Sequence, residues 1–333
     1  MLVLTPGAEE HENIIGLGDI EAARRRLQGV TLRTPLVPCP RGEQDRALYF
    51  KPESLQPTGA FKLRGAYNKI SSLSPEDSRR GVVAHSSGNH AQAVAYAALA
   101  LGVKATIVMP RGASRVKLDA TAELGAEVIL VGPSSAERSR KAEELAEEHG
   151  YVPVPPYDDE VLIAGQGTIG AEILEDLPDV GTVLVPVSGG GLIGGISAAI
   201  KLARPDVRVI GVEPELAADA RASLESGSLV EFPADRVART VADGLRVQKL
   251  GEAPFEHIRT FVDDILAVTE REILEAMRRL ALRVRLVAEP SGAVTFAAYL
   301  FHRGELPTSR LTVAVISGGN VEPGLLAEIL STR

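Results

Sequence analysis

The residue best placed to take part in a reaction is Lys62, which follows the Pro-Thr-Gly turn at residues 57–59 and the aromatic Phe61. A lysine amine that is held in place and kept partly neutral can form a Schiff base with a carbonyl group. A surface lysine near the start of a helix is the ordinary alternative for this pattern. Lys62 is therefore a candidate covalent anchor, and its role depends on what the rest of the chain places beside it.

A second chemical feature is the run Ser-Ser-Gly-Asn-His at residues 86–90, which follows an expected strand at 82–85 and opens an expected helix at 89–101. Backbone amides and hydroxyls at the start of a helix form a pocket suited to a carboxylate or an oxyanion. Plain N-capping by Ser or Asn explains the same residues equally well. His90 is a weaker candidate acid or base, because a histidine at a helix start can simply be packed.

A glycine-rich loop reads Ser-Gly-Gly-Gly-Leu at residues 188–192, between an expected strand at 182–187 and an expected helix at 192–203. Successive small residues expose backbone N–H groups, which is what a phosphate monoester requires. A tight contact between helix and strand is the structural alternative. The loop is a candidate phosphate site.

A dinucleotide site competes for the same loop. Gly189, Gly191 and Gly194 satisfy the G-x-G-x-x-G spacing after a strand, and Glu213 ends the next strand, where a ribose-binding acid would lie. A nucleoside triphosphate P-loop is disfavoured because no Gly-Lys-Ser/Thr follows. A nicotinamide-dependent oxidoreductase therefore stays open at this point.

Ser317 opens a third loop, Ser-Gly-Gly-Asn at residues 317–320, after an apolar strand expected at 311–316. Its hydroxyl could hydrogen-bond a ring nitrogen or cap the following helix. In parallel sheets, ligands bind at the carboxyl ends of the strands. All three loops follow strands, so they are the expected places for a ligand.

The elements that must position these loops are strands and helices that alternate from residue 82 onward, which predicts parallel pairing and helices flanking each sheet. The run from 82 to about 150 forms one lobe, and the alternation resumes after the Pro-rich residues 152–156 to form a second. For two of the helices the sequence predicts bounds: one covers residues 20–28 with Asp19 as its N-cap, and another lies near 168–176.

Composition narrows the class of protein. The 333 residues provide enough apolar material for one large or two medium α/β lobes. Acidic residues outnumber basic ones by 44 − 36 = 8 and no basic stripe occurs, which argues against nucleic acid and for a small-molecule partner. Cys39 is the only cysteine, so a disulfide framework is excluded and a reducing cytoplasm is favoured. Neither a membrane span nor a signal peptide is expected.

Taken together, five segments are specific, although none is so alone. They are residues 56–65, 86–92, 164–169, 188–192 and 317–320. From about residue 19 to 330 the chain resembles the fold type II pyridoxal-phosphate enzymes, specifically the threonine/serine dehydratase and serine racemase family.

The resemblance implies the two-lobed, tryptophan synthase β-like fold, in which each lobe is a mostly parallel sheet flanked by helices. The large, cofactor-binding domain would comprise residues 1–75 and 155–333. Residues 80–150 would form a small, mobile, substrate-binding domain.

The same resemblance gives cofactor roles to individual residues. Lys62 would anchor pyridoxal 5'-phosphate and act as the base on the Cα proton, so burial should lower its pKa. Phe61 would lie behind the pyridine ring, Asn89 would hydrogen-bond the 3-oxygen, and Ser317 would face the ring nitrogen. The phosphate would be held by Ser188, Gly189, Gly190, Gly191 and Leu192.

Substrate roles follow in the same way. The substrate carboxylate would be bound by the loop residues Ser86, Ser87, Asn89 and His90, with Arg138 closing over it. In the resembled racemases a serine at the place of Ser87 stands opposite the lysine, so side racemase activity is expected.

The resemblance implies β-elimination from L-threonine to give 2-oxobutyrate and ammonia, and from L-serine to give pyruvate. The run Pro-Tyr-Asp-Asp at residues 156–159 looks closer to the threonine dehydratases than to the racemases. Serine racemase and threo-3-hydroxyaspartate dehydratase remain alternatives. The nicotinamide-dependent oxidoreductase fits these residues less well than the pyridoxal-phosphate enzyme, because it leaves Lys62 and Ser317 without a role.

Two further features are implied by the racemase-like members. Glu213, Asp219 and the carbonyl of Ala217 match an oxygen-rich site for Mg²⁺ or Ca²⁺, with solvated loop charges as the alternative. A homodimer or homotetramer is expected. The chain ends near residue 333, so we expect neither the C-terminal regulatory domain of the feedback-inhibited dehydratases nor inhibition by isoleucine.

Overall fold

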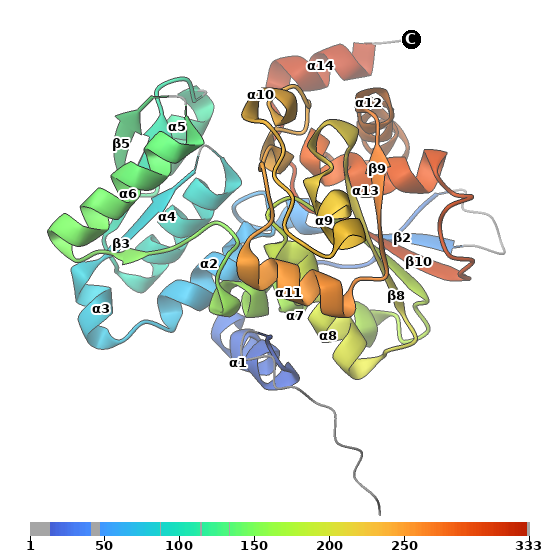
Figure 1. Cartoon of the computed structure of the whole chain (residues 1–333), viewed down its shortest axis with the longest axis horizontal. Coiled ribbons are helices and arrows are strands. Elements are labelled where there is room, and N and C mark those ends of the chain that lie inside the picture. The colour runs from blue at the N-terminus through green and yellow to red at the C-terminus, as the bar shows by residue number, and fades with distance from the viewer. Residues whose placement is uncertain (1–13, 41–46, 87, 114, 133, 332–333) are drawn as a thin grey trace, which may run out of the picture.

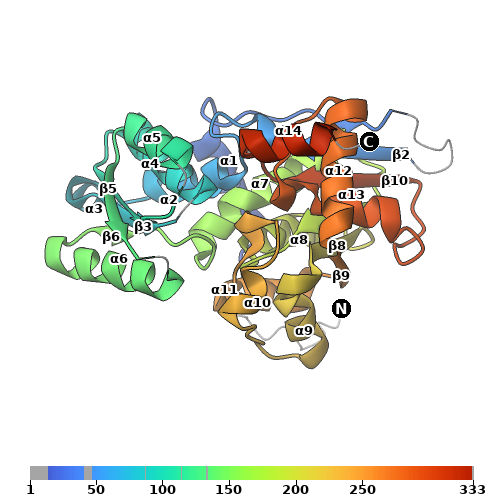
Figure 2. The same ribbon diagram turned by 90° about the horizontal axis from the view of Figure 1, so that it is seen from above.

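The computed structural model describes residues 14–40, 47–86, 88–113, 115–132 and 134–331. The strands form two separate sheets, and the two sheets lie side by side in both ribbon views (Figure 1, Figure 2). Within the described residues, no helix is long and apolar enough to cross a membrane. The mostly parallel pairing and the flanking helices confirm the predicted α/β class.

The larger sheet has six strands in the order β1-β2-β10-β7-β8-β9. All neighbours are parallel except β1 and β2. The strands are β1 Val37–Pro38, β2 Ala47–Pro52, β7 Thr182–Pro186, β8 Arg208–Pro214, β9 Asp264–Val268 and β10 Leu311–Ile316. Alternate residues of β10 enter the two hydrophobic clusters on opposite faces of the sheet, so this sheet is buried on both sides.

Helices cover both faces of the six-stranded sheet. On one face lie α7 Glu160–Asp176, α8 Gly191–Ala203 and α11 Glu252–Phe261, and on the other α12 Glu270–Arg279, α13 Pro290–Phe301 and α14 Pro323–Ser331. Helix α1, Leu17–Leu27, packs on the outside of α7 and α8. We call this sheet and its helices the large lobe.

The smaller sheet has four parallel strands in the order β5-β4-β3-β6. They are β3 Val82–His85, β4 Ala105–Pro110, β5 Glu127–Val131 and β6 Val152–Pro153. Helices α4 Asn89–Leu101 and α5 Arg115–Glu123 cover one face, where α2 Lys62–Ser71 also packs, and α6 Ser135–His149 covers the other. We call this sheet with α4, α5 and α6 the small lobe.

Short elements complete the described chain. They are η1 Glu53–Leu55, α3 Pro75–Arg80, η2 Glu215–Ala217, α9 Asp219–Ser226, α10 Ala234–Val237, η3 Asp243–Leu245 and the π-helical turn η4 Leu280–Val284. Several of them were not predicted, because each is too short to show a helical period.

Two helix starts differ from the sequence prediction. Helix α1 begins at Leu17, and Asp19 lies within its first turn, where its carboxylate accepts a hydrogen bond from Gly16 N at 2.9 Å. The predicted N-cap role of Asp19 is therefore wrong. Helix α7 begins well before residue 168, because Asp159 caps it by accepting from Leu162 N at 2.9 Å.

Glycines inside α7 hid its true length in the sequence, since glycine normally weakens a helix. They are needed because three helices approach closely here. A Cβ at Gly165 would lie 2.7 Å from Arg64 O of α2, and a Cβ at Gly167 would lie 3.0 Å from Gly195 O of α8. Helix α7 is thus the element against which the lysine helix and the glycine-loop helix are both set.

Beneath α2 lies a cluster of four charged side chains that we call the floor cluster: Lys51, Glu53, Arg64 and Glu172. Arg64 donates to Glu53 Oε2 at 2.8 Å and to Glu172 Oε1 at 2.6 Å, and Lys51 Nζ donates to Glu172 Oε2 at 2.6 Å. Burial alone would raise the pKa of Glu53, but Arg64 outweighs it and holds that pKa below its ordinary value. The cluster fixes α2 two residues beyond Lys62.

Candidate active site

The turn that carries Lys62 is joined to the turn that carries Ser317. Phe61 N donates to Ser317 O at 3.0 Å, and Gly319 N donates to Gly59 O at 2.9 Å. Gly59 has a φ of +72°, and a Cβ there would overlap the side chain of Asn320. Two segments at opposite ends of the chain are thereby brought together, so that Lys62 and Ser317 lie on adjoining turns.

The amine of Lys62 donates to the carbonyl of Pro156, in the segment that leads from β6 to α7. It also lies 5.2 Å from the centre of the Phe61 ring. Burial lowers the pKa of Lys62 to about 8, in agreement with the sequence expectation. At pH 7 roughly a tenth of the amines are then neutral, far more than for a solvated lysine.

The glycine loop begins α8 and has the features of a phosphate cradle. Gly190 is in the left-handed region with φ +92°, and a Cβ on Gly191 would lie 2.9 Å from Tyr157 O. A Cβ on Gly189 would overlap the Tyr157 ring. Ser188 Oγ is buried and has no hydrogen-bond partner among the described residues.

These observations fit a phosphate group. Leu192 and the residues before it present the first N–H groups of α8, which have no acceptor within the helix. The buried, unpartnered Ser188 hydroxyl, three residues before Gly191, is a further donor available to such a group. The loop also touches Tyr157, the neighbour of Pro156, so the cradle lies beside the amine of Lys62.

The hydrogen-bond partners of Asn89 determine which way its side-chain amide is turned. Its Nδ2 donates to Glu289 Oε1 at 2.6 Å, while its Oδ1 accepts from Asn320 Nδ2 at 2.8 Å. Asn320 Nδ2 also donates to the carbonyl of Thr58 at 2.9 Å, which fixes the direction of its own amide. Asn89 therefore has a second N–H hydrogen for another acceptor, such as a phenolic oxygen.

Glu289 is a site residue that the sequence reading missed. It is 4% exposed, and burial together with the nearby Asp243 raises its pKa to about 7. In the sequence it reads as an acid just before a helix that starts with proline, which is the pattern of an ordinary N-terminal acid. Only the fold shows that it faces Asn89.

The predicted carboxylate loop lies at the start of α4. Ser86 Oγ accepts from Gly88 N at 3.2 Å, whereas Ser87 lies outside the described residues. His90 Nε2 donates to Val154 O at 2.9 Å, and burial lowers the pKa of His90 to about 3. His90 is thus a neutral ring that ties α4 to the segment after β6, and a contribution to carboxylate binding would come from its backbone N–H.

Arg138 lies on α6 near His85, the last residue of β3. Burial lowers the pKa of the Arg138 guanidinium, and burial together with Arg138 lowers the pKa of His85. Its role over the substrate carboxylate stays a prediction.

The predicted cation site contains two buried carboxylates. Glu213 accepts from Arg221 N at 2.9 Å and Ala220 N at 3.2 Å, and burial raises its pKa well above the ordinary value. Burial raises the pKa of Asp219 to about 7, and its Oδ2 has no partner among the described residues. Ala217, two residues before Asp219, is also buried.

The same contacts bear on the dinucleotide alternative. Glu213 is fully buried and caps α9, so its carboxylate is not presented to a ribose. The structure therefore gives no support to a nicotinamide site.

Polar contacts also join the two lobes across this site. Lys117 Nζ of α5 lies 2.8 Å from Asp243 Oδ2 of the large lobe. Burial would lower the pKa of Lys117, but Asp243 and Glu289 raise it above its ordinary value. We call Asn89, Glu289, Asn320, Lys117 and Asp243 the seam.

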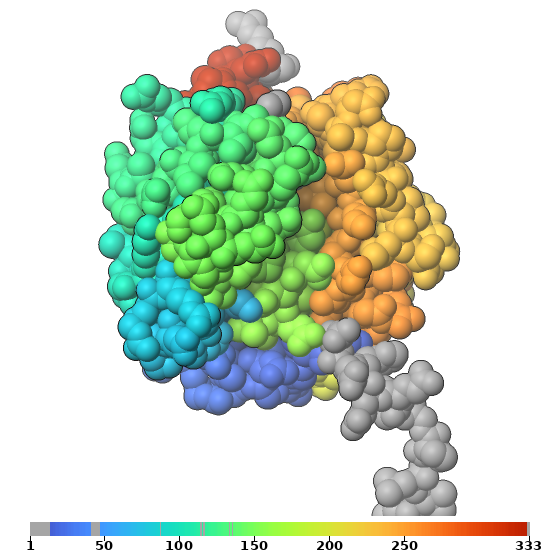
Figure 3. Space-filling view, turned by 60° about the vertical axis from the view of Figure 1, so that its left-hand side comes forward, coloured from blue at the N-terminus to red at the C-terminus, as the bar shows by residue number. Residues whose placement is uncertain are grey.

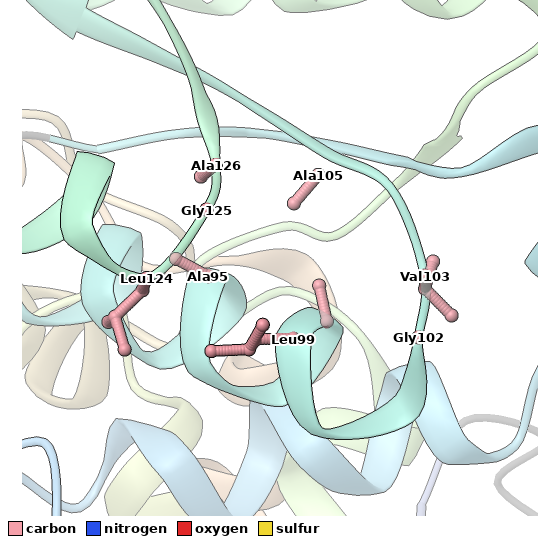
Figure 4. Close-up of a pocket in the computed structure, with 9 residues that line it drawn as sticks. Ala95, Leu99, Gly102, Val103, Ala105, Leu124, Gly125 and Ala126 are labelled. Atoms are coloured by element: carbon pink, nitrogen blue, oxygen red, sulfur yellow. The ribbon is translucent and has the colours of Figure 1, made fainter.

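The surface between the lobes is hollowed. In Figure 3 a hollow separates the green surface of the small lobe from the orange surface of the large lobe, with yellow-green atoms of the chain after residue 150 at its floor. The pocket in Figure 4 is a different feature. It measures about 120 Å³ and is lined by apolar residues of the small lobe such as Ala95, Leu99 and Ala126. It offers no side chain suited to chemistry.

Comparison with known proteins places these features in context. A family model described as "Pyridoxal-phosphate dependent enzyme" matches residues 27–318. The chain is 46% identical over 326 residues to the L-threonine ammonia-lyase of Thermotoga maritima, covering 96% of this chain and 79% of the relative. It is 41% identical to the L-threo-3-hydroxyaspartate ammonia-lyase of Saccharomyces cerevisiae, covering 95% and 96%.

Solved structures agree with these relatives. The structure of maize serine racemase superimposes with a TM-score of 0.89 at 36% identity, covering 94% of this chain and 96% of that one. The similar proteins therefore share one fold and differ in the reactions in their names.

Proposed function

Because the chain belongs to the family of pyridoxal-phosphate-dependent enzymes, we propose that it is an ammonia-lyase for small β-hydroxy amino acids. L-threonine would give 2-oxobutyrate and ammonia, and L-serine would give pyruvate and ammonia. The observation that carries this proposal is that the turn before Lys62 is hydrogen-bonded to the Ser317 turn, while the Lys62 amine donates to Pro156, the neighbour of the Tyr157 that touches the glycine loop. The water lost with the β-hydroxyl is regained on hydrolysis, so the reaction needs no oxidant.

Each part of the site would hold one part of the cofactor. Ser188, Gly189, Gly190, Gly191 and Leu192 would hold the phosphate, as supported by the unpartnered Ser188 hydroxyl. Phe61 would lie against the ring, Ser317 would face its nitrogen, and the second N–H of Asn89 would reach its 3-oxygen. When bound, the cofactor supplies a conjugated ring that spreads the negative charge left at Cα.

Lys62 would anchor the cofactor and then remove the Cα proton. A base must be neutral before it accepts a proton, and a pKa of about 8 leaves a useful neutral fraction near neutral pH. Ser317 is a neutral partner for the ring nitrogen, so it does not force a proton onto it. We infer that this favours prompt loss of the β-hydroxyl.

The substrate carboxylate would be held at the start of α4 by Ser86, Ser87, Asn89 and the backbone of His90, with Arg138 closing over it. The small domain, residues 80–150, would move against the large one, residues 1–75 and 155–333. The seam supports this, because its contacts are polar and its Lys117–Asp243 pair is partly exposed.

Threonine is our first choice of substrate. The relative with 46% identity is named for it, and residues 156–159 read Pro-Tyr-Asp-Asp. The yeast relative is named for 3-hydroxyaspartate and the maize structure for serine racemisation, so both reactions are alternatives that the assay must test.

Other parts of the proposal concern the surroundings of the site. Glu213, Asp219 and the Ala217 carbonyl would bind Mg²⁺ or Ca²⁺, supported by the unpartnered Asp219 Oδ2 and the raised pKa of both carboxyls. The protein would act in the cytoplasm as a homodimer or homotetramer.

The test begins with a visible absorption spectrum of the purified protein. We expect a yellow protein, a colourless and inactive Lys62→Ala variant, and a yellow Lys104→Ala control, since Lys104 is exposed and pairs with the exposed Glu127 just before β4, at the end of the strand opposite the carboxyl end. Release of 2-oxo acid is then measured with L-threonine, L-serine and threo-3-hydroxyaspartate, and serine enantiomers are separated. If L-threonine gives no 2-oxobutyrate while serine enantiomers interconvert, the substrate assignment is wrong.

A further inference from the structure

Gln166 of α7 has a buried side chain with no visible reason to be polar. Its exposure is 0%, and neither Nε2 nor Oε1 has a hydrogen-bond partner among the described residues. Buried amides in folded proteins are nearly always hydrogen-bonded, so each exception needs an explanation. An apolar residue of similar shape would fill the same space without leaving a donor and an acceptor unpaired.

The position of Gln166 suggests the explanation. A Cβ built on Gly65 of α2 would overlap Nε2 of the Gln166 side chain, and a Cβ built on Gly195 of α8 would lie 3.1 Å from the backbone carbonyl carbon of Gln166. Gln166 is therefore held between the lysine helix and the phosphate helix.

Both contacts lie about one helical turn from the start of their helices, a distance of roughly 5.4 Å along the axis. Gly65 follows Lys62 by one turn of α2, and Gly195 follows Gly191 by one turn of α8. Side chains on a helix tilt toward its N-terminus. Because α8 runs alongside α7 in the same direction, this tilt carries the Gln166 amide toward the cradle.

We propose that Gln166 is a cofactor-positioning residue, whose carboxamide finds its hydrogen-bond partners at the phosphate end of the bound cofactor, directly or through water that the phosphate orders. The inference rests on the cofactor, and it holds whichever hydroxy amino acid is the substrate. It also gives a role to the Gln of residues 164–169, which no other contact in the site explains.

The test compares Gln166→Met, which keeps the length of the side chain without its polar atoms, with the wild type. The melting temperature of the cofactor-free protein should stay equal or rise, because an unpaired amide has been removed. The dissociation constant of pyridoxal phosphate, measured by absorbance titration, should increase by roughly tenfold, which is about 1.4 kcal/mol. A purely structural glutamine would not give this opposite pair of effects.

Gln56→Met is the matched control. Gln56 is also a buried glutamine, but its amide is paired: Nε2 donates to Leu32 O at 2.8 Å, and Oε1 accepts from Leu32 N at 2.9 Å. Its substitution should lower the melting temperature of the cofactor-free protein.

A second arm uses inorganic phosphate as the probe. Phosphate should raise the melting temperature of the cofactor-free wild type more than that of Gln166→Met. An equal response would overturn the assignment to the phosphate end. A lower melting temperature for cofactor-free Gln166→Met would show a permanently bound water or structural role and would also overturn the inference. A wild type that binds no pyridoxal phosphate would instead defeat the proposed function itself.

Discussion

The floor cluster consists of charged side chains and the seam of charged and amide side chains, and the two differ in burial and in what they connect. The floor cluster lies within the large lobe, and none of its side chains is more than 11% exposed. The seam joins the two lobes, and its Asp243 side chain is 43% exposed. The first therefore fixes the helix of Lys62, whereas the second is the contact that would open in the proposed movement of the small lobe.

The difference extends to charge. In the floor cluster two cations meet two carboxylates, so every charge has a partner. In the seam, burial and then the nearby Asp243 raise the pKa of Glu289 to about 7, so that its carboxyl is partly protonated near neutral pH. A buried group with its charge balanced gives rigidity, and one that gains or loses a proton near pH 7 gives an adjustable contact.

The largest expected effect is that of Arg64→Met on stability. It leaves Glu53 and Glu172 buried without their guanidinium, so the free energy of unfolding should fall by about 3–5 kcal/mol. Urea denaturation of the cofactor-free protein measures this. Arg33→Met is the control, because its pairs with Glu175 and Asp176 are exposed and should contribute at most about 1 kcal/mol. Equal losses would remove the distinction between fixed and adjustable charges.

Glu289→Gln tests the adjustable side. Burial raises the folded-state pKa of Glu289 to about 7 from an ordinary value of 4.5, so folding favours the protonated form. This stability is fully present below pH 4.5 and is lost as pH rises through about 7, a loss on the order of 3 kcal/mol.

The free energy of unfolding of Glu289→Gln should therefore fall less than that of the wild type between pH 4.5 and 8, because glutamine does not titrate. Denaturation at several pH values measures the difference between the two proteins. Parallel curves would mean that Glu289 is ionised throughout and that the seam is as fixed as the floor.

A third prediction concerns the rate at which cofactor-free protein takes up pyridoxal phosphate. Only the neutral amine of Lys62 reacts with a carbonyl, and its pKa is lowered to about 8 by burial. The rate should rise roughly tenfold from pH 6 to pH 7 and level off above pH 8. Stopped-flow absorbance follows the uptake. A rise that continues to pH 10 would show an unperturbed lysine that the surroundings do not hold.

The smallest effect is expected for the exposed end of the seam. Lys117→Gln and Asp243→Asn should each reduce stability by at most about 1 kcal/mol, since the pair is partly exposed. Each should raise KM more than it lowers kcat, because in the proposed movement the pair would stabilise the closed lobes. The double variant should add little to either single one. Fully additive changes would show that the two side chains do not act as a pair.

The sequence predicted the parts of this molecule that repeat a general pattern. Strands β3 and β10 and the loops after them were located because a buried parallel strand followed by small polar residues has a recognisable composition. The convergence of Lys62 with Ser317 was expected from the family resemblance alone, since nothing local in either segment points to the other.

The residues that were missed depend on tertiary contacts. Arg64 reads as a surface residue of a helix until Glu53 and Glu172 are brought to it. Glu289 likewise carries no signal apart from the fold that buries it. Gln166 lies in the specific segment 164–169, but nothing in the sequence indicates what its side chain contacts. The predicted start of α7 lay too far toward the C-terminus for the same reason, because the glycines of this helix are explained only by α2 and α8 packed against it.

The place of β10 has a consequence for how the protein is made. This strand lies between β2 and β7 in the middle of the large sheet, although it is the most C-terminal of the strands. A ribosome must therefore release residues 311–320 before β2 gains its parallel neighbour and before Phe61 N finds the carbonyl of Ser317. Because such long-range pairing is slow, the growing chain exposes the edges of β2 and β7 until residues 311–316 have been made and have paired with them. Binding of the cofactor is thus a late event, and it reports that the whole large sheet has formed.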